Sequence, residues 1–363
     1  MGKRELFIIC AFVVAGVAAY QLSAPPAAEG QGFSLTRFLQ GIRREVNPAS
    51  ASYEQRGRIP LGRGIKELRF SGAVRQLRIT GEDREDLEYE LVVNSSGPDE
   101  ATATSYAKRT MLQPDEIDET LTLEINYPEE ATQTAGLSLR VPHEIAVRIS
   151  GRGTPVVTNV HAVYLESLLG DATLEGINGE VHGSHRSGRL TVKGAERVDL
   201  TLNSSRATLV DISRGLTLNV QGGECSVSES RGPVTIEGRN AEMRVADHDG
   251  DIRVTGTGGN LRIDAPGGWV KADVQRMEVE VTVDTAVPMT LFTTDEPLRL
   301  LLPDEAKLAV DAATSGGEIQ SSEFDLTPDV RGRDARLSHN FGASQPKIAL
   351  RNSRGDIVIR RRK

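Results

Sequence analysis

The chain has 363 residues, 36 of them glycine, and only 4% are aromatic, a composition unlike that of an ordinary α/β enzyme. Its formal net charge of −8 excludes the basic excess typical of nucleic-acid-binding proteins. Its two cysteines exclude both a disulfide framework and a cysteine-rich metal site. The length allows two or three domains, or one elongated domain.

An apolar segment near the N-terminus predicts a membrane anchor. Lys3 and Arg4 precede an uncharged run over residues 6–20, which residues 21–24 extend close to the roughly 20 residues that span a bilayer. Positive charge before such a run retains the N-terminus in the cytoplasm and directs the rest across the membrane. We expect a transmembrane signal anchor over residues 1–24 and a periplasmic or extracellular domain after it, with a cleaved signal peptide as the alternative.

Residues 25–62 are predicted to form a linker that contains a short amphipathic helix. Apolar side chains recur at helical spacing over residues 33–46, among three arginines. Such a helix either rests on a lipid surface or covers the end of the next domain. The Asn-Pro pair at 47–48 ends it, and no further helix is predicted after about residue 50.

Residues 63–150 contain strand-like segments separated by charged or Gly/Pro turns. They are less regular than the segments that follow them. We expect them to form irregular β coils that cap the start of a repeat, because a stack of coils needs its open end covered.

From Val163 onward the sequence divides into units of nine residues. The first and third positions are mostly apolar and the second is mostly polar, which predicts one brief strand and one turn per unit. A glycine recurs at the eighth position, where it marks a backbone of positive φ or a close approach between neighbouring coils. These glycines are Gly170, Gly179, Gly188, Gly223, Gly232, Gly250, Gly259 and Gly268.

Two units make one coil of about 18 residues. This period predicts an all-β, single-stranded β-solenoid of the β-helix or β-roll kind over residues 151–363, with coils stacked at ~4.8 Å. Cys225 occupies an apolar position and is predicted to be interior. A polar segment over residues 321–345 interrupts the repeat, and residues 347–361 close the chain with a strand, a turn and a strand. The apolar residues that mark successive coils are Val181, Val198, Leu216, Val234, Ile252 and Val270.

Four turns carry a resemblance to a known family. Residues 169–174 (LGDATL), 248–254 (HDGDIRV), 314–319 (TSGGEI) and 352–359 (NSRGDIVI) resemble the Ser-x-Gly-Asp-hydrophobic turns of the bacterial "putative adhesin" domain family of unknown function. The resemblance covers roughly residues 65–360. It implies an extracytoplasmic β-solenoid, often behind a membrane anchor, and the family name implies adhesion. It supplies no catalytic or ligand residues.

Three carboxylates are weak metal candidates. Asp247, Asp249 and Asp251 alternate as the ligands of a calcium loop do. The glycine and glutamate that an EF-hand loop needs at its sixth and twelfth positions are missing, so a solvated turn is the alternative.

Two further motifs have structural alternatives. His182 and His185, with His248 farther along, are weighed as metal ligands against exposed polar positions. The triplet at residues 354–356 spells Arg-Gly-Asp, which animal integrins bind, but it lies where the family's Gly-Asp turn belongs.

An outward column of hydroxyls is predicted on one face of the coils. It contains Thr173, Thr191, Thr208 and Ser226, and Arg244 and Arg262 continue it.

No catalytic motif is found: the sequence lacks a GxSxG elbow, a phosphate loop, a paired-histidine motif and a cysteine-nucleophile context. We therefore expect no enzyme activity, no catalytic residues and no cofactor. The sequence predicts a membrane-anchored, extracytoplasmic, non-catalytic adhesion or interaction scaffold of unknown ligand, whose coils repeat weak contacts. Its expected partners are the membrane, through the N-terminal helix, and a cell-surface polymer or envelope protein, but not nucleic acid; its oligomeric state is left open.

Two other functions remain as alternatives. One is a cell-envelope structural or signalling partner that binds another protein through an end coil or a sheet edge. The other is a β-helix polysaccharide lyase or hydrolase that uses the turn containing Asp247, Asp249 and Asp251.

Overall fold

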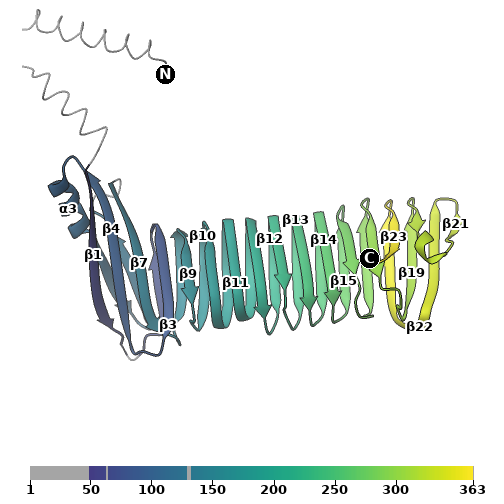
Figure 1. The fold of residues 1–363 in the computed structure, drawn as a ribbon, viewed down its shortest axis with the longest axis horizontal. Coiled ribbons are helices and arrows are strands. Elements are labelled where there is room, and N and C mark those ends of the chain that lie inside the picture. Colours follow the sequence, from purple (N-terminus) through teal and green to yellow (C-terminus); the bar gives the residue numbers. More distant parts are fainter. Residues whose placement is uncertain (1–48, 63, 129–131, 363) are drawn as a thin grey trace, which may run out of the picture.

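The computed structural model describes residues 49–62, 64–128 and 132–362. Within these ranges the fold is nearly all β, with 23 strands, one α-helix and one short 3₁₀ helix. Most of the strands stack side by side into a long rod, and a wider sheet lies at one end (Figure 1). The predicted all-β class is confirmed.

The elements fall into three groups along the chain. The first contains β1 (Ala49–Pro60), β2 (Glu67–Ser71), β3 (Gln76–Glu82), β4 (Asp86–Gly97), α3 (Glu100–Arg109), β5 (Met111–Ile117), β6 (Thr120–Asn126) and β7 (Gln133–Pro142). The second contains β8 (Ala146–Arg152), β9 (Pro155–Thr158), β10 (Ala162–Leu169), β11 (Ala172–Ile212), β12 (Leu216–Ser228), β13 (Val234–His248), β14 (Ile252–Pro266), β15 (Val270–Gln275), β16 (Glu278–Thr282), β17 (Met289–Thr294) and β18 (Leu298–Leu302). The third contains β19 (Leu308–Ser315), β20 (Ile319–Gln320), η2 (Ser322–Phe324), β21 (Asp329–Arg331), β22 (Asp334–Ser353) and β23 (Ile357–Arg361).

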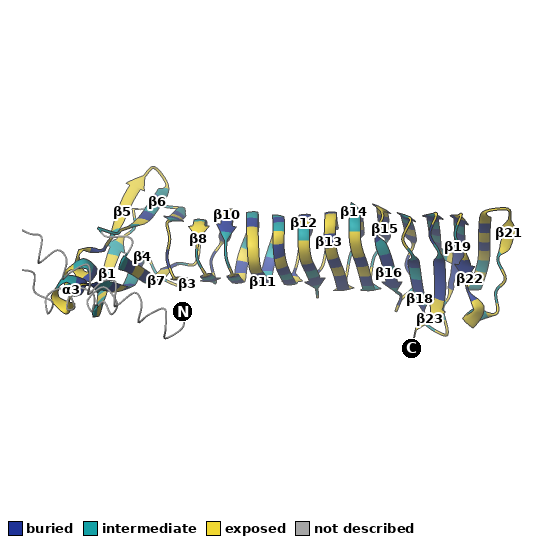
Figure 2. Cartoon of the chain, turned by 90° about the horizontal axis from the view of Figure 1, so that it is seen from above, coloured by how far each residue is buried: buried dark blue, intermediate teal, exposed yellow. Residues whose placement is uncertain are grey.

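Parallel pairing between successive coils follows the predicted period. Val198 pairs with Leu216, which pairs with Val234, and Val234 pairs with Ile252. Each pairing advances the chain by 18 residues, so equivalent positions form straight columns along the rod. Side chains alternate between a buried interior and the surface, as the period-2 pattern requires (Figure 2).

A narrow core explains the shortage of aromatic residues. The buried apolar side chains are nearly all Val, Leu, Ile or Ala, and Phe70 is the one aromatic member within the described part of the chain. Cys225 is 1% exposed, which confirms its predicted interior position, and burial raises the pKa of its thiol to about 12. A Cys at this site therefore packs as a small apolar residue.

The recurring glycines lie where neighbouring coils approach closely at a corner. Gly250 has φ of 156°, and a Cβ on it would collide with the carbonyl oxygen of Gly232 in the preceding coil. Gly232 itself has φ of 78°, and its Cβ would lie 2.7 Å from the Arg214 carbonyl oxygen. Both reasons given for glycine at this turn, the positive φ and the close approach, therefore apply.

The C-terminal end of the rod is not stacked in chain order. The strand over residues 347–353 pairs with β17 on one side and β19 on the other, and β23 pairs with β18 and β20. Residues 347–361 therefore form a coil inserted between β17–β18 and β19–β20. They form the expected strand, turn and strand, but the end of the stack lies elsewhere: residues 334–342 and β21 lie antiparallel beyond β19 and cover its edge.

At the N-terminal end, too, one coil is stacked out of chain order. β2 pairs with both β6 and β8, and β3 pairs with both β7 and β9, so the first coil lies between two later ones. Beyond this coil, β4 pairs antiparallel with β7, and β1 pairs antiparallel with β4. The result is a twisted sheet in the order β1, β4, β7, β3 at the end of the rod (Figure 1).

Two expectations about this end are corrected. The sequence predicts a linker over residues 25–62, but residues 49–60 form β1. The half-buried face of β1 carries mostly small and polar residues, so this segment lacks the apolar run that marks a strand. The expectation of no helix after about residue 50 is also wrong, because α3 covers residues 100–109. Asp99 caps it by accepting a hydrogen bond from the Thr102 amide at 2.8 Å, and it buries only Ala103 and Ala107.

Helices that could cross a membrane are not found in residues 49–62, 64–128 and 132–362. The predicted anchor over residues 1–24 and the predicted helix over residues 33–46 lie outside the described residues.

Replacing Gly250 by alanine should destabilise the rod. The backbone at this corner has positive φ and no room for a methyl group, so we expect a loss of about 1–3 kcal/mol in the free energy of unfolding. Thermal denaturation followed by circular dichroism measures the effect. Gly64→Ala is the control, because a Cβ on Gly64 meets no atom within 4 Å. Equal melting temperatures for the two variants would contradict this account of the corner.

Candidate functional site

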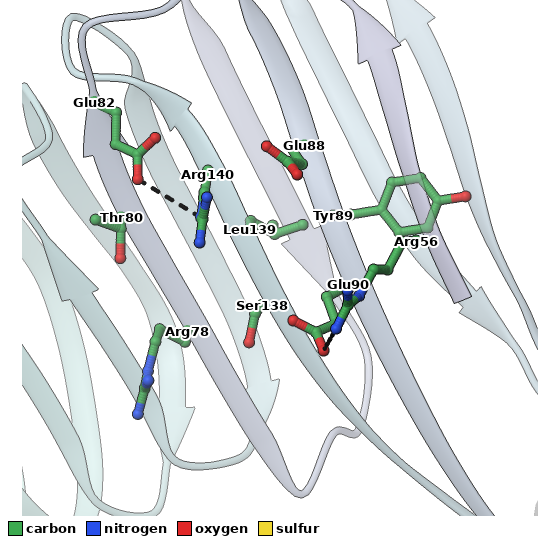
Figure 3. Close-up of a pocket in the computed structure, with 10 residues that line it drawn as sticks. All are labelled: Arg56, Arg78, Thr80, Glu82, Glu88, Tyr89, Glu90, Ser138, Leu139 and Arg140. Atoms are coloured by element: carbon green, nitrogen blue, oxygen red, sulfur yellow. Dashed lines mark hydrogen bonds and ion pairs between the residues drawn. The ribbon is translucent and has the colours of Figure 1, made fainter. Parts of the chain in front are cut away.

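The outer face of the N-terminal sheet is hollowed into a groove of about 570 Å³. One row of its lining crosses four strands: Arg56 on β1 lies opposite Glu90 on β4, which lies opposite Ser138 on β7, which lies next to Arg78 on β3. Figure 3 shows these side chains on one face of the sheet. The groove exists because β1 and β4 widen the sheet beyond the width of a coil.

A second hollow of about 490 Å³ continues the first along the same face. The two share Arg78 and Ser138, and the second adds Arg75, Gln76 and Asn94. Its floor includes Gly136, where a Cβ would meet nothing nearer than the Gln76 carbonyl oxygen at 4.0 Å. The missing side chain thus leaves open space, and we call the two hollows together the sheet groove.

The acidic side chains of the sheet groove lie near β1 and the first turn and are paired. Arg56 Nη2 lies 3.2 Å from Glu90 Oε1, and Arg140 Nε lies 3.7 Å from Glu82 Oε1. Arg84, only 12% exposed, also lies 3.3 Å from Glu82. These contacts neutralise much of the negative charge at this end.

The other end of the sheet groove carries free positive charge. Arg75 and Arg78 are exposed, and among the described residues no carboxylate lies within ion-pair distance of either. The neighbours of Arg78 in its row, Ser138 and Val156, are uncharged. A guanidinium in this setting is available to bind a carboxylate or phosphate group with two parallel hydrogen bonds.

The three candidate metal ligands do not converge. Asp247 occupies a left-handed corner with φ of 48°, Asp249 forms a backbone bridge with Arg231, and Asp251 Oδ1 accepts a hydrogen bond from the Trp269 amide at 3.2 Å. In the part of the chain that the structure describes, no group of three or more His, Cys, Asp or Glu side chains could hold a metal ion.

The aspartate of the Gly-Asp turns joins neighbouring coils. Asp171 Oδ1 accepts the Arg189 amide at 2.8 Å, just as Asp251 accepts that of Trp269. In the Arg-Gly-Asp triplet, Asp356 Oδ1 accepts the Glu318 amide at 2.9 Å, and Arg354 pairs with Asp295 at 2.7 Å. The turn motif is therefore explained by stacking, and both charged side chains of the triplet have partners within the fold.

The candidate histidines lie in different environments. His182 is exposed and lies 3.4 Å from Asp199, as a polar surface residue does. His185, for which an exposed polar position is the alternative to metal binding, is instead 0% exposed, and His248 is 2% exposed, because both rings occupy the inside of coil corners. The His185 ring contacts Ser205 Oγ at 2.8 Å and the Gly170 carbonyl at 2.7 Å. A nine-residue pattern does not show on which side of a corner a side chain points.

Burial lowers the pKa of both interior imidazoles. His248 Nδ1 lies 2.9 Å from Ser230 Oγ, and its Nε2 has no hydrogen-bond partner within the described ranges. A positive charge on this ring would be buried without a counter-charge in contact with it, so the folded protein favours the neutral form.

The outward hydroxyl column is confirmed over part of its length: Thr208 aligns with Ser226, Arg244 and Arg262. Toward the other end, Thr173 aligns with Val156 and then Arg78. The sheet groove therefore lies at the N-terminal end of the same column. We did not anticipate it from the sequence, because antiparallel pairing of β4 with β7 brings together residues that share no repeat position.

A family model described as Toastrack DUF4097 matches residues 85–360. A solved putative adhesin from Parabacteroides distasonis ATCC 8503 is 12% identical with a TM-score of 0.42, covering 69% of this chain and 97% of that one. A putative adhesin from Parabacteroides merdae ATCC 43184 is 14% identical with a TM-score of 0.26, covering 85% and 96%. No curated protein matches the chain.

The buried histidines should make the fold sensitive to mild acid. Because their pKa is lower in the folded than in the unfolded chain, the unfolded chain binds more protons below about pH 6.5. Stability should therefore fall as pH drops from about 6.5 to 5, by up to about 1.4 kcal/mol per pH unit for each buried ring. Melting temperatures at both pH values measure this loss.

His248→Gln should show a smaller loss of stability over this pH range than the unmodified chain. His182→Gln is the matched control, since His182 is exposed and should leave the pH dependence unchanged. The explanation fails if both variants retain the full acid sensitivity.

Proposed function

Because the chain belongs to the Toastrack DUF4097 family, we propose that it is a membrane-anchored, extracytoplasmic scaffold that binds a cell-surface polymer without catalysis. Residues 1–24 supply the anchor, and the stack of coils forms a β-solenoid of about 18 residues per coil. In sequence, residues 25–48 separate this anchor from the N-terminal sheet. In this proposal the protein acts in adhesion or interaction, in the periplasm or outside the cell.

The observation that supports binding is the sheet groove. It combines two exposed guanidinium groups, Arg75 and Arg78, with the hydroxyl of Ser138 and the amides of Gln76 and Asn94. These groups suit an extended chain that carries anionic groups at intervals, with hydroxyls between them. An acidic polysaccharide has this chemistry. A compact neutral ligand would leave the two guanidinium groups unused.

The coils extend this surface. Thr208, Ser226, Arg244 and Arg262 continue a polar column along the rod, at the spacing of stacked strands. A polymer that enters the sheet groove can follow the column, so that individually weak contacts add. This is the role proposed for repetition in the fold.

Binding to polygalacturonate, a carboxylated polymer, tests the proposal, with uncharged dextran as the reference. The full chain is purified in detergent and immobilised for biolayer interferometry. Arg78→Ala should weaken binding by about tenfold, on the order of one lost charge-assisted hydrogen-bonded pair. Arg186→Ala is the matched control, because Arg186 is also exposed but lies on the coils away from the sheet groove. Binding should weaken as salt is added.

A second variant tests whether binding depends on the shape of the sheet groove as well as on its charge. Gly136→Leu fills the space above β7 without a backbone clash, and it should reduce polygalacturonate binding while leaving the melting temperature unchanged. If polygalacturonate and dextran bind equally, or if Arg78→Ala and Gly136→Leu both bind normally, the sheet groove is not the binding site.

The location is tested separately. A phosphatase that is active only outside the cytoplasm is fused after residue 48, with and without residues 1–24. We expect activity only when residues 1–24 are present, because this segment carries the charge and length of a signal anchor. Equal activity for both fusions would contradict the proposed location.

A further inference from the structure

β1 is the outermost strand of the N-terminal sheet. Its 12 residues pair with β4, and with no other strand in the described part of the chain. Figure 1 shows β1 as the last strand of the sheet on the side away from the coils, with α3 beside its upper part. An edge of this length offers a row of backbone N–H and C=O groups to another strand, and such edges are usually kept short or interrupted.

The sequence of β1 is complementary to itself in one antiparallel register. Along an edge strand, the residues whose backbone groups point outward alternate, so a symmetric pair of identical strands must be centred on a residue. Centring on Gln55 places Glu54 of each copy opposite Arg56 of the other. Centring on Glu54 or on Arg56 instead places two like charges face to face, which opposes pairing.

The other positions fit the Gln55-centred register. It places Tyr53 opposite Gly57, an aromatic and glycine pair that suits a sheet edge, and Ala51 opposite Ile59. Glu54 and Arg56 pair with each other at 2.5 Å along the outer face, and their side chains are still 47% and 69% exposed, which leaves both within reach of a second strand. Arg56 already pairs with Glu90 on its other side at 3.2 Å. The register would therefore extend an existing row of alternating charge.

We propose that β1 pairs antiparallel with β1 of a second copy of this chain, centred on Gln55, to form a two-fold dimer. Residues opposite each other in an antiparallel pair point to the same face, so the two-fold axis is perpendicular to the sheet. The two N-terminal sheets join into one continuous sheet, and both sheet grooves lie on the same side of it. The two rods extend in opposite directions. A single polymer can then occupy two grooves at once, which goes beyond the function proposed above.

Cysteine cross-linking tests the register in the full chain. Cys10 is first replaced by alanine, and Cys225 stays because it is buried. Gln55→Cys should give a disulfide-linked dimer under mild oxidation, because the two copies of residue 55 face each other. Ser52→Cys is the matched control, since residue 52 faces residue 58 in this register. Equal cross-linking at both positions, or none at position 55 in a folded variant, would overturn the proposal.

Charge exchange provides a second test that depends on no new disulfide. Glu54→Arg alone, or Arg56→Glu alone, places two like-charged pairs across the dyad, and each should weaken self-association by about tenfold or more in analytical ultracentrifugation. Mixed together, the two variants regain complementary charges and should form a heterodimer as tight as the original dimer. A chain that is monomeric before substitution, or variants that dimerise alone as well as they do when mixed, would refute the pairing.

Discussion

Parallel hydrogen bonding between coils, repeated every 18 residues, is the constraint on which the rest of the structure depends. It places every residue directly above its equivalent in the preceding coil. A side chain that is too large for its position therefore collides with the neighbouring coil. At the corner that contains Gly232 and Gly250, the stacking leaves no room for a Cβ. In the interior it leaves a narrow core, filled mostly by Val, Leu, Ile and Ala side chains. Composition, the glycine positions and the choice of apolar residues all follow from this arrangement.

A stack of parallel strands has two open ends, and the same arrangement of strands covers both of them. At each end one coil is stacked out of chain order. The first coil, β2–β3, lies between two coils that come later in the sequence, and the coil of residues 347–361 lies between two coils that come earlier. Beyond it, antiparallel strands cover the last parallel strand. At the C-terminal end this cover is small, formed by β21 and part of β22. At the N-terminal end it grows into β4 and β1, which widen the sheet enough to carry a groove.

Sequence reasoning succeeded where a local pattern determines the structure. Alternation and glycine spacing gave the coils, their period and the interior place of Cys225. It failed where distant segments meet. Nothing near residues 49–60 indicates that β4 will pair with them, α3 buries only two alanines, and the direction of His185 and His248 depends on the curvature of a corner. The sheet groove was missed for the same reason: Arg56, Glu90, Ser138 and Arg78 become neighbours only after three separate pairings.

The division between coils and ends also explains where recognition is to be sought. Within the coils, each conspicuous motif is used for stacking: the Gly-Asp turns bind the next coil through Asp171, Asp251 and Asp356, and buried histidines fill corners. A residue that must satisfy its equivalents above and below has little freedom to serve a ligand. The N-terminal sheet is free of that requirement, since β1 and β4 belong to no coil. Its outer face can therefore combine an open floor with guanidinium groups that have no ion-pair partner among the described residues, and its edge can carry alternating charge.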